Sequence, residues 1–193
     1  MKRLLIIAGP SAVGKTTVAK DILDRGVGFE LSRSATTRAP RGDGHDQEYI
    51  YLSENEFRQK INDGDMLEYT EYGGNIYGTP ASEIERIYGE GKIPLLVLDI
   101  NGVVSLKNNT RGLDPFAAYI TADMEILDKR LYERAEREGF SEKAMATYER
   151  RKAQNRIDLQ RVLSLSSVFD RRVENTEVSL CADQIIDAFN EID

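Results

Sequence analysis

The sequence contains very little cysteine and histidine, one residue of each in 193. The single cysteine, Cys181, excludes an internal disulfide and a zinc site built from several thiolates. Cys181 lies in an apolar helical pattern, so we expect a small core residue, as suits a reducing cytosol. The single histidine, His45, excludes a metal site of several histidines and a Ser-His-Asp arrangement. We interpret His45 as a loop residue, because glycine and aspartate surround it.

Long hydrophobic runs are also absent. No stretch reaches the ~20 apolar residues that a membrane span needs. Only five apolar residues stand between Arg3 and Gly9, too few for a signal peptide. The net charge of −7 argues against a general nucleic-acid binder, whose surface is usually basic. We therefore expect a cytoplasmic protein that binds neither membranes nor nucleic acid, as a monomer or a homodimer.

The most informative stretch that is present runs from Gly9 to Thr17. It fits the phosphate-binding loop pattern of Gly, four residues, Gly-Lys-[Ser/Thr]. A short apolar run at 4–8 precedes it, typical of a buried strand, and a helical pattern follows at 16–25. An accidental match in a strand-to-helix turn is the alternative, which this order of strand, loop and helix disfavours. The predicted ATP-binding residues of the loop are Gly9, Pro10, Ser11, Ala12, Val13, Gly14, Lys15, Thr16 and Thr17.

The residue types of this loop suit a nucleoside triphosphate. Gly9 and Gly14 let the backbone turn, so that N–H groups and a helix N-terminus converge on an anion. Lys15 adds a positive charge for the β- and γ-phosphates, and the Thr16 hydroxyl is placed to ligate the accompanying Mg²⁺. The sequence therefore predicts ATP with Mg²⁺ at this loop.

The rest of the chain alternates strand and helix patterns. Residues 93–99 form an apolar run that ends in Asp99, like a buried parallel strand with a carboxylate at its C-terminal end. We predict that Asp99 contributes to the Mg²⁺ shell, the alternative being a helix N-cap. Residues 116–120 predict a further core strand. These patterns indicate an α/β P-loop NTPase core, a parallel sheet flanked by helices with ligands at the C-terminal strand edge.

Two segments interrupt this alternation. Short strand patterns between 34 and 79, with a turn at Gly73-Gly74, predict a small antiparallel insertion. Between 123 and 164 the sequence is helical and dense in charge, broken at Gly139 and restarted at Ser141. We therefore expect a single domain over 1–193, with a core at about 1–33, 80–122 and 165–193, a substrate-binding insertion at about 34–79 and a helical lid at about 123–164.

Taken together, these motifs resemble the guanylate kinase family over nearly the whole chain. Residues 9–15 are similar to the family's Gly-Pro-Ser-Gly-x-Gly-Lys loop, with Ala12 in place of the usual glycine. Residues 34–41 resemble its Ser-x-Thr-Thr-Arg-x-Pro-Arg signature, and Glu48-Tyr49, Leu67-Glu68 and Tyr77-Gly78-Thr79 follow in the family's order and spacing. The resemblance implies ATP-dependent phosphorylation of GMP to GDP.

The resemblance also implies which residues bind GMP. The guanidinium forks of Arg38 and Arg41 would hold the GMP phosphate, with hydroxyls from two tyrosines. The Glu68 carboxylate would accept from guanine N1–H and the 2-amino group, two donors that adenine lacks. Asn101 stands where the family has a second acid. Residues 99–102 are also two residues shorter than the corresponding stretch of the family. The implied GMP-binding set is Ser34, Arg38, Arg41, Tyr49, Glu68, Tyr77, Thr79 and Asn101.

The helical segment supplies further arginines. Residues 130–134 resemble the family's Arg-Leu-x-x-Arg, which would bring Arg130 and Arg134 to the ATP phosphates. Arg150 would join them from the next helix, with Arg151 as its rival. Asn175 looks like the family's adenine-side asparagine. The implied catalytic residues are Lys15, Arg38, Arg130, Arg134 and Arg150.

Two other functions stay open at this point. One is a related P-loop kinase with a different acceptor, which Asn101 leaves possible. The other is a guanylate kinase-like module that binds a phosphopeptide without catalysis. The intact residues Lys15, Thr16 and Asp99 argue against the second.

Overall fold

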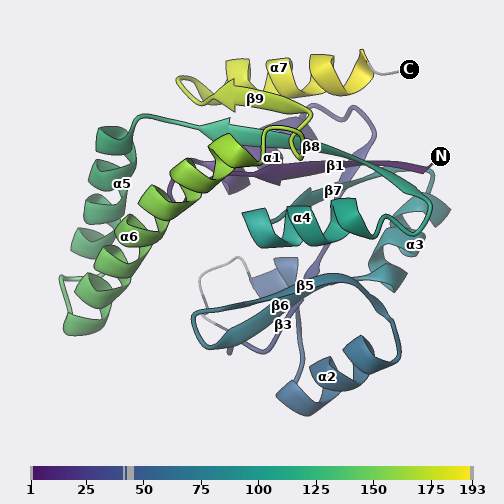
Figure 1. Ribbon diagram of the computed structural model, residues 1–193, viewed down its shortest axis with the longest axis horizontal. Helices are drawn as coiled ribbons and strands as arrows, with labels where there is room; N and C mark the ends of the chain where they lie inside the picture. Colours follow the sequence, from purple (N-terminus) through teal and green to yellow (C-terminus); the bar gives the residue numbers. More distant parts are fainter. Residues whose placement is uncertain (1, 41, 43–45, 192–193) are drawn as a thin grey trace.

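Five parallel strands form the centre of the part of the chain that the computed structural model describes, residues 2–40, 42 and 46–191 (Figure 1). Their order is β2 (Phe29–Leu31), β7 (Ile93–Val97), β1 (Lys2–Ala8), β8 (Leu113–Thr121) and β9 (Arg171–Glu174). Every neighbouring pair is parallel. The C-terminal ends of all five strands therefore lie at one edge, where central β1 delivers the chain to Gly9.

Helices cover both faces of this sheet. On one face α1 (Lys15–Asp24) and α7 (Val178–Asn190) pack their buried residues against the strands. On the other face lie α3 (Ala81–Gly89) and α4 (Ile100–Asn108). The predicted α/β core with a parallel sheet flanked by helices is therefore confirmed, although the sequence analysis predicted no helix at α4.

A second, smaller sheet holds four strands in the order β4 (Tyr49–Tyr51), β3 (Ser34–Thr36), β6 (Asn75–Pro80) and β5 (Met66–Tyr72). The β3–β6 and β5–β6 pairs are antiparallel, as predicted. The β3–β4 pair is parallel, so this sheet is mixed rather than wholly antiparallel. After the 3₁₀ turn Asp46–Glu48, α2 (Glu54–Asn62) buries Phe57 in the small core of this sheet, and Ser53 and Glu56 form the predicted capping box.

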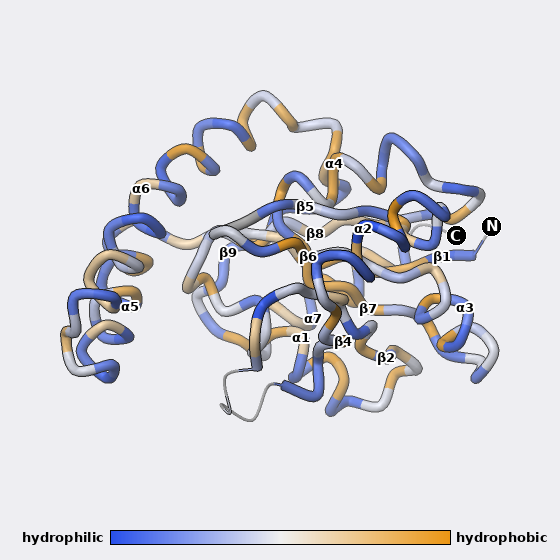
Figure 2. The backbone as a smooth tube through the Cα atoms, turned by 90° about the horizontal axis from the view of Figure 1, so that it is seen from below, coloured by the Kyte–Doolittle hydropathy of each residue, from blue (hydrophilic) through white to orange (hydrophobic). Residues whose placement is uncertain are grey.

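A helical hairpin of α5 (Met124–Arg137) and α6 (Glu142–Ser164) projects from the two sheets (Figures 1 and 2). The break at Gly139 and the N-cap at Ser141 are confirmed, since Ser141 Oγ accepts from the Ala144 N–H. Leu131 and Tyr148 belong to a small apolar cluster between the helices. In the part of the chain described, no helix is both long and apolar enough to cross a membrane.

An ion pair joins the two chain crossings between the sheets. Arg33 directly precedes β3, and Glu83 lies in the first turn of α3, just after β6. Arg33 donates from Nε and Nη2 to the two Glu83 oxygens, at 3.1 and 2.6 Å. Glu83 is only 4% exposed, and the hydrogen bonds from Arg33, with those from Arg86, lower its pKa to about 2.

We predict that Glu83→Gln lowers the free energy of unfolding at pH 7 by about 2 kcal/mol, because charged hydrogen bonds to Arg33 are lost. The folded pKa of Glu83 lies below the unfolded value of about 4.3, so its contribution is complete above that pH. It is lost as the pH falls toward 2. Urea unfolding at pH 7 and pH 3 should show the difference shrink, with exposed Glu85→Gln as the control. Equal losses in both variants would contradict this role.

Candidate active site

A cleft of about 700 Å³ lies between the C-terminal edge of the large sheet, the small sheet and the helical hairpin. It brings together most of the residues predicted from the sequence. From the phosphate-binding loop and its helix these are Gly9, Ser11, Ala12, Gly14, Lys15, Thr16 and Thr17; from elsewhere they are Ser34, Arg38, Tyr49, Glu68, Tyr77, Asp99, Arg130, Arg134 and Asn175.

Other predicted residues do not line this cleft. Pro10, Val13, Thr79, Asn101 and Arg150 lie outside its lining. Arg41, predicted to bind phosphate, and His45, predicted to be a loop residue, lie outside the described residues. The cleft also gathers residues that no motif predicted as site residues: Thr70, Gly78, Val97, Leu98, Glu133, Arg137, Gln154, Asp158 and Val178.

Two glycines allow the loop after β1 to pass very close to its surroundings. Gly9 has φ 154° and Gly14 has φ 101°, both in the region that favours glycine. A Cβ on Gly14 would lie 2.6 Å from Asn175 Nδ2, and one on Gly9 would collide with the Ile120 carbonyl. Ala12 also has a positive φ, 66°, at the position where the resemblance led us to expect glycine. The positive φ angles at Gly9, Ala12 and Gly14 make the backbone curve between strand β1 and helix α1.

Lys15 at the start of α1 folds back over this curved loop. Its Nζ donates to the Gly9 and Pro10 carbonyls, at 2.8 and 3.0 Å, so the ammonium is folded over the loop. Burial lowers the pKa of Lys15 to about 8, while the Asp158 and Asp99 carboxylates oppose that fall. A bound polyanion would add negative charge beside this ammonium and so favour its protonated form.

Thr16 and Asp99 lie in the same cleft and are the candidate metal contacts. Asp99 Oδ1 accepts from the Gly102 N–H at 2.8 Å, so Asp99 also caps α4, the alternative role considered from the sequence. Asp158 of α6 faces the same region, and burial raises its pKa. No group of three or more histidine, cysteine or carboxylate side chains in the described ranges could hold a metal ion alone. The site fits Mg²⁺, which takes few protein ligands and several phosphate oxygens.

Glu68 of β5 is the buried acid of the opposite wall. It is 3% exposed, and its Oε1 accepts from the Thr79 hydroxyl at 2.7 Å. Burial raises the pKa of Glu68 to about 7; the Thr79 hydrogen bond opposes this rise and the charge of Asp99 adds to it. A Cβ on Gly102 would lie 2.8 Å from Glu68 Oε2, so glycine leaves the room that this carboxylate occupies. Thr79 thus acts on the cleft through Glu68.

Arg38 is held at the cleft by aromatic and polar neighbours. Its guanidinium lies 5.0 Å from the centre of the Tyr49 ring. Its Nη2 reaches the Tyr51 hydroxyl at 3.5 Å, and an Asp46 oxygen lies 4.0 Å away. Tyr51 in turn donates to Asp46 at 2.5 Å. These contacts hold the Arg38 guanidinium in the cleft that Tyr49 and Tyr77 also line.

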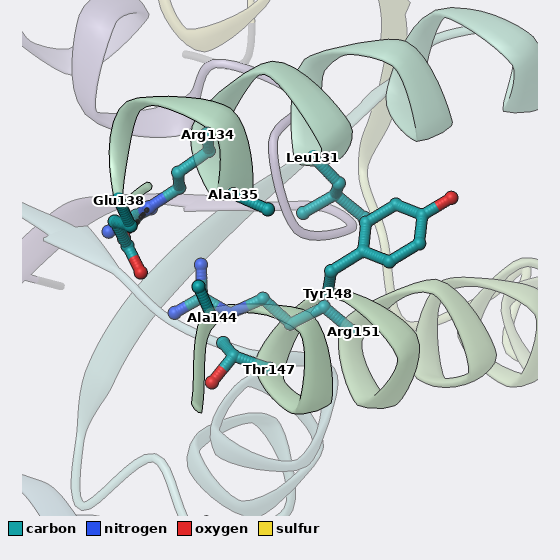
Figure 3. Close-up of a pocket in the computed structure, with 8 residues that line it drawn as sticks. All are labelled: Leu131, Arg134, Ala135, Glu138, Ala144, Thr147, Tyr148 and Arg151. Atoms are coloured by element: carbon teal, nitrogen blue, oxygen red, sulfur yellow. Dashed lines mark hydrogen bonds and ion pairs between the residues drawn. The ribbon is translucent and has the colours of Figure 1, made fainter. Parts of the chain in front are cut away.

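The hairpin contributes arginines from both of its helices. Arg130 donates to the Ala12 and Val13 carbonyls at 3.3 and 3.2 Å, and Arg134 contacts Glu138. Arg134 of α5 and Arg151 of α6 lie on facing sides of the space between the helices (Figure 3). Both arginines also line the large cleft.

The positions of Arg150 and Arg151 distinguish the two rivals. Arg150 points to the tip of the β5–β6 turn, where a Cβ on Gly73 would lie 3.2 Å from its Nη1. Arg151 lines the cleft, as do Gln154 and Asp158. These three residues recur at the three-to-four-residue spacing of one helix face, but the spacing alone does not show which face of α6 turns toward the cleft.

Two asparagines have structural partners. Asn101 is exposed on α4, where its Oδ1 accepts from Arg161 Nη1 at 2.5 Å, away from the cleft lining. Asn175 is 4% exposed, and its Nδ2 donates to the Val13 carbonyl at 2.7 Å. Asn175 therefore lines the cleft and also stabilises the loop through its hydrogen bond to Val13. A direct adenine contact at Asn175 and a guanine contact at Asn101 stay predictions.

A parallel α/β sheet whose central strand runs into this loop defines a P-loop protein. A model of the family described as Guanylate kinase matches residues 1–190. The chain belongs to the guanylate kinase family.

The chain is also similar to individual members of this family. The guanylate kinase of Clostridium perfringens (strain SM101 / Type A) is 40% identical over 133 residues, 68% of this chain and 61% of that protein. The chain therefore spans less than two thirds of the length of this relative. The guanylate kinase of Gloeobacter violaceus is 33% identical over 189 residues, 96% of this chain and 85% of that protein. The crystal structure of guanylate kinase from Anaplasma phagocytophilum shares the fold, with a TM-score of 0.71 at 24% identity, covering 97% of this chain and 84% of that one.

We predict that Asn175→Ala lowers the free energy of unfolding by about 1 kcal/mol, because the Val13 carbonyl loses its 2.7 Å hydrogen bond and keeps only the 3.2 Å one from Arg130. The matched change Asn55→Ala, at an exposed position of α2, should stay within about 0.5 kcal/mol of the parent. Urea denaturation of the three proteins measures both values. A loss no larger at Asn175 than at Asn55 would show that this amide does not support the loop.

Proposed function

We propose that the protein transfers the γ-phosphoryl group of ATP to GMP, giving ADP and GDP, in the cytoplasm and with Mg²⁺. One observation carries this proposal: a single cleft contains both a phosphate-binding loop with Lys15 and a buried carboxylate, Glu68, on the opposite wall. Membership of the guanylate kinase family and the names of the relatives support the same reaction.

On the donor side, the loop N–H groups and Lys15 bind the ATP phosphates. Arg130, Arg134 and Arg151 neutralise negative charge on the phosphates and orient the γ-phosphoryl group toward the acceptor. Thr16 and Asp99 would hold Mg²⁺, which when bound neutralises charge on the transferring phosphoryl group. No covalent intermediate on the protein is needed, because both substrates are held in one cleft.

On the acceptor side, Arg38 binds the GMP phosphate, with Arg41 as a further predicted partner and the Tyr49 and Tyr77 hydroxyls as donors. Ionised Glu68 accepts from guanine N1–H and the 2-amino group, and Ser34 reaches the guanine edge. Adenine has no equivalent pair of donors, so its binding would leave the buried carboxylate without these two hydrogen bonds.

The direct test is ADP formation from Mg-ATP with GMP, dGMP, AMP, CMP or UMP, beside a reaction without acceptor. We expect rapid turnover with GMP and little with AMP. Lys15→Ala, prepared identically, should reduce turnover to background and so exclude a contaminating kinase. Turnover with another acceptor alone would indicate a different kinase, and absence of turnover with every acceptor would favour a binding module.

The titration of Glu68 gives a second prediction. With a pKa of about 7, Glu68 is about one-tenth ionised at pH 6 and about nine-tenths ionised at pH 8. The KM for GMP should therefore be about tenfold higher at pH 6 than at pH 8, because only the carboxylate accepts from guanine. Steady-state kinetics at fixed saturating ATP measure this ratio.

Glu68→Gln provides the control for this pH dependence. Titration of the GMP phosphate affects both proteins equally, so the ratio of their KM values isolates Glu68. That ratio should change between pH 6 and pH 8, and the variant should lose selectivity for GMP over AMP. A constant ratio would remove Glu68 from the guanine site.

A further inference from the structure

A buried asparagine of α6 holds the phosphate-binding loop. Asn155 is 1% exposed. Its Oδ1 accepts from the Ser11 N–H at 2.7 Å, and its Nδ2 donates to the Ser11 carbonyl at 3.0 Å. One side-chain amide therefore satisfies both backbone groups of a loop residue 144 positions earlier in the chain. Buried amides require such partners, so neither group can be lost without cost.

The position of Asn155 on α6 links this contact to the cleft. Arg151 lies four residues before it and Asp158 three residues after it, on the same helix face, and both line the cleft. Asp158 and Arg151 each act electrostatically on Lys15. A shift of α6 along the loop would thus move an arginine and a carboxylate relative to this ammonium.

The other helix of the hairpin reaches the neighbouring loop residues. Arg130 of α5 donates to the Ala12 and Val13 carbonyls. The Ala12 side chain packs against the apolar cluster that contains Leu131 and Tyr148. The hairpin is therefore attached to the loop from α5 at residues 12 and 13 and from α6 at Ser11. Asn155 supplies the α6 attachment with two hydrogen bonds of normal length.

We propose that Asn155 is a positioning residue: its amide fixes the Ser11 segment of the loop against α6, and thereby sets where Arg151 lies relative to the ATP phosphates. The kinetic part of this inference rests on the proposed function. The contact with Ser11 itself does not, so it can be tested in the protein without substrates.

Two variants separate hydrogen bonding from packing. Asn155→Ala removes the amide and its volume, whereas Asn155→Leu keeps a side chain of similar size but can make neither hydrogen bond. The exposed Asn55→Ala change is the matched control. All proteins are compared at a temperature where circular dichroism shows them to be folded.

The first measurement is hydrogen exchange at the Ser11 amide by NMR in the ligand-free protein. We expect this amide to be protected in the parent and in Asn55→Ala, and to exchange at least tenfold faster in both Asn155 variants. A parent Ser11 amide that exchanges at the rate of an unfolded peptide would overturn the proposal. Exchange at the parent rate in both Asn155 variants would overturn it as well, and neither comparison requires enzymatic activity.

The second measurement is ATP affinity by calorimetry together with steady-state kinetics. Both Asn155 variants should lose at least tenfold in kcat/KM for ATP and several-fold in ATP affinity, while KM for GMP changes less than twofold. Parent-like ATP parameters, an equal change in both KM values, or recovery in Asn155→Leu would each overturn the positioning role. If the parent turned over no acceptor, the proposed function would fail, whereas calorimetry and Ser11 exchange would still decide the role of Asn155.

Discussion

The structure depends on a close approach of the backbone at the end of β1. The loop passes so near the Ile120 carbonyl and the Asn175 amide that a side chain at Gly9 or Gly14 would have no space. This approach turns a buried strand directly into a helix whose first residue is Lys15. Since β1 is the middle strand of the large sheet, every other wall of the cleft is placed relative to this one turn.

The opposite wall of the cleft contains a buried carboxylate, Glu68. The buried Glu68 carboxylate accepts from the side chain and the backbone of Thr79, and its high pKa reflects the remaining cost of keeping charge there. A ligand that presents two donors to this carboxylate relieves that cost, whereas one without them adds to it. In the proposed reaction, recognition of guanine therefore depends on the cost of burying the Glu68 carboxylate, which the two guanine donors reduce.

Local patterns predicted much of this architecture. The loop at 9–17, the strand ending before Asp99 and the break at Gly139 each have a strong local signal, and all three are confirmed. No helix was predicted at α4, because Gly102 and two valines after it have weak helix propensity and packing on the sheet decides their conformation. The parallel β3–β4 pair depends on contacts between strands, which a single strand pattern does not specify.

The site was predictable to the extent that its residues belong to motifs. Gly9, Lys15, Arg38 and Glu68 were selected from such motifs, and the structure gathers them in one cleft. Arg151 required knowledge of which face α6 turns inward. Asn155 stands in a charged helical stretch where a solvated asparagine is the ordinary expectation, so only its burial distinguishes it. Local sequence patterns do not predict the role of a side chain when that role depends on a contact far along the chain.

The arrangement of the two sheets has a consequence for how such a protein can diversify. The chain leaves the large sheet after β2 and returns through α3, and Arg33 and Glu83 join these two crossings at one point. Between them, Ala35, Phe57, Met66 and Ile76 form a separate small core, while Leu67 packs with the core beside α4. Evolution or an engineer could therefore exchange this lobe as a unit and retain the loop that binds the triphosphate, provided that the Arg33–Glu83 junction and the packing of Leu67 beside α4 are kept.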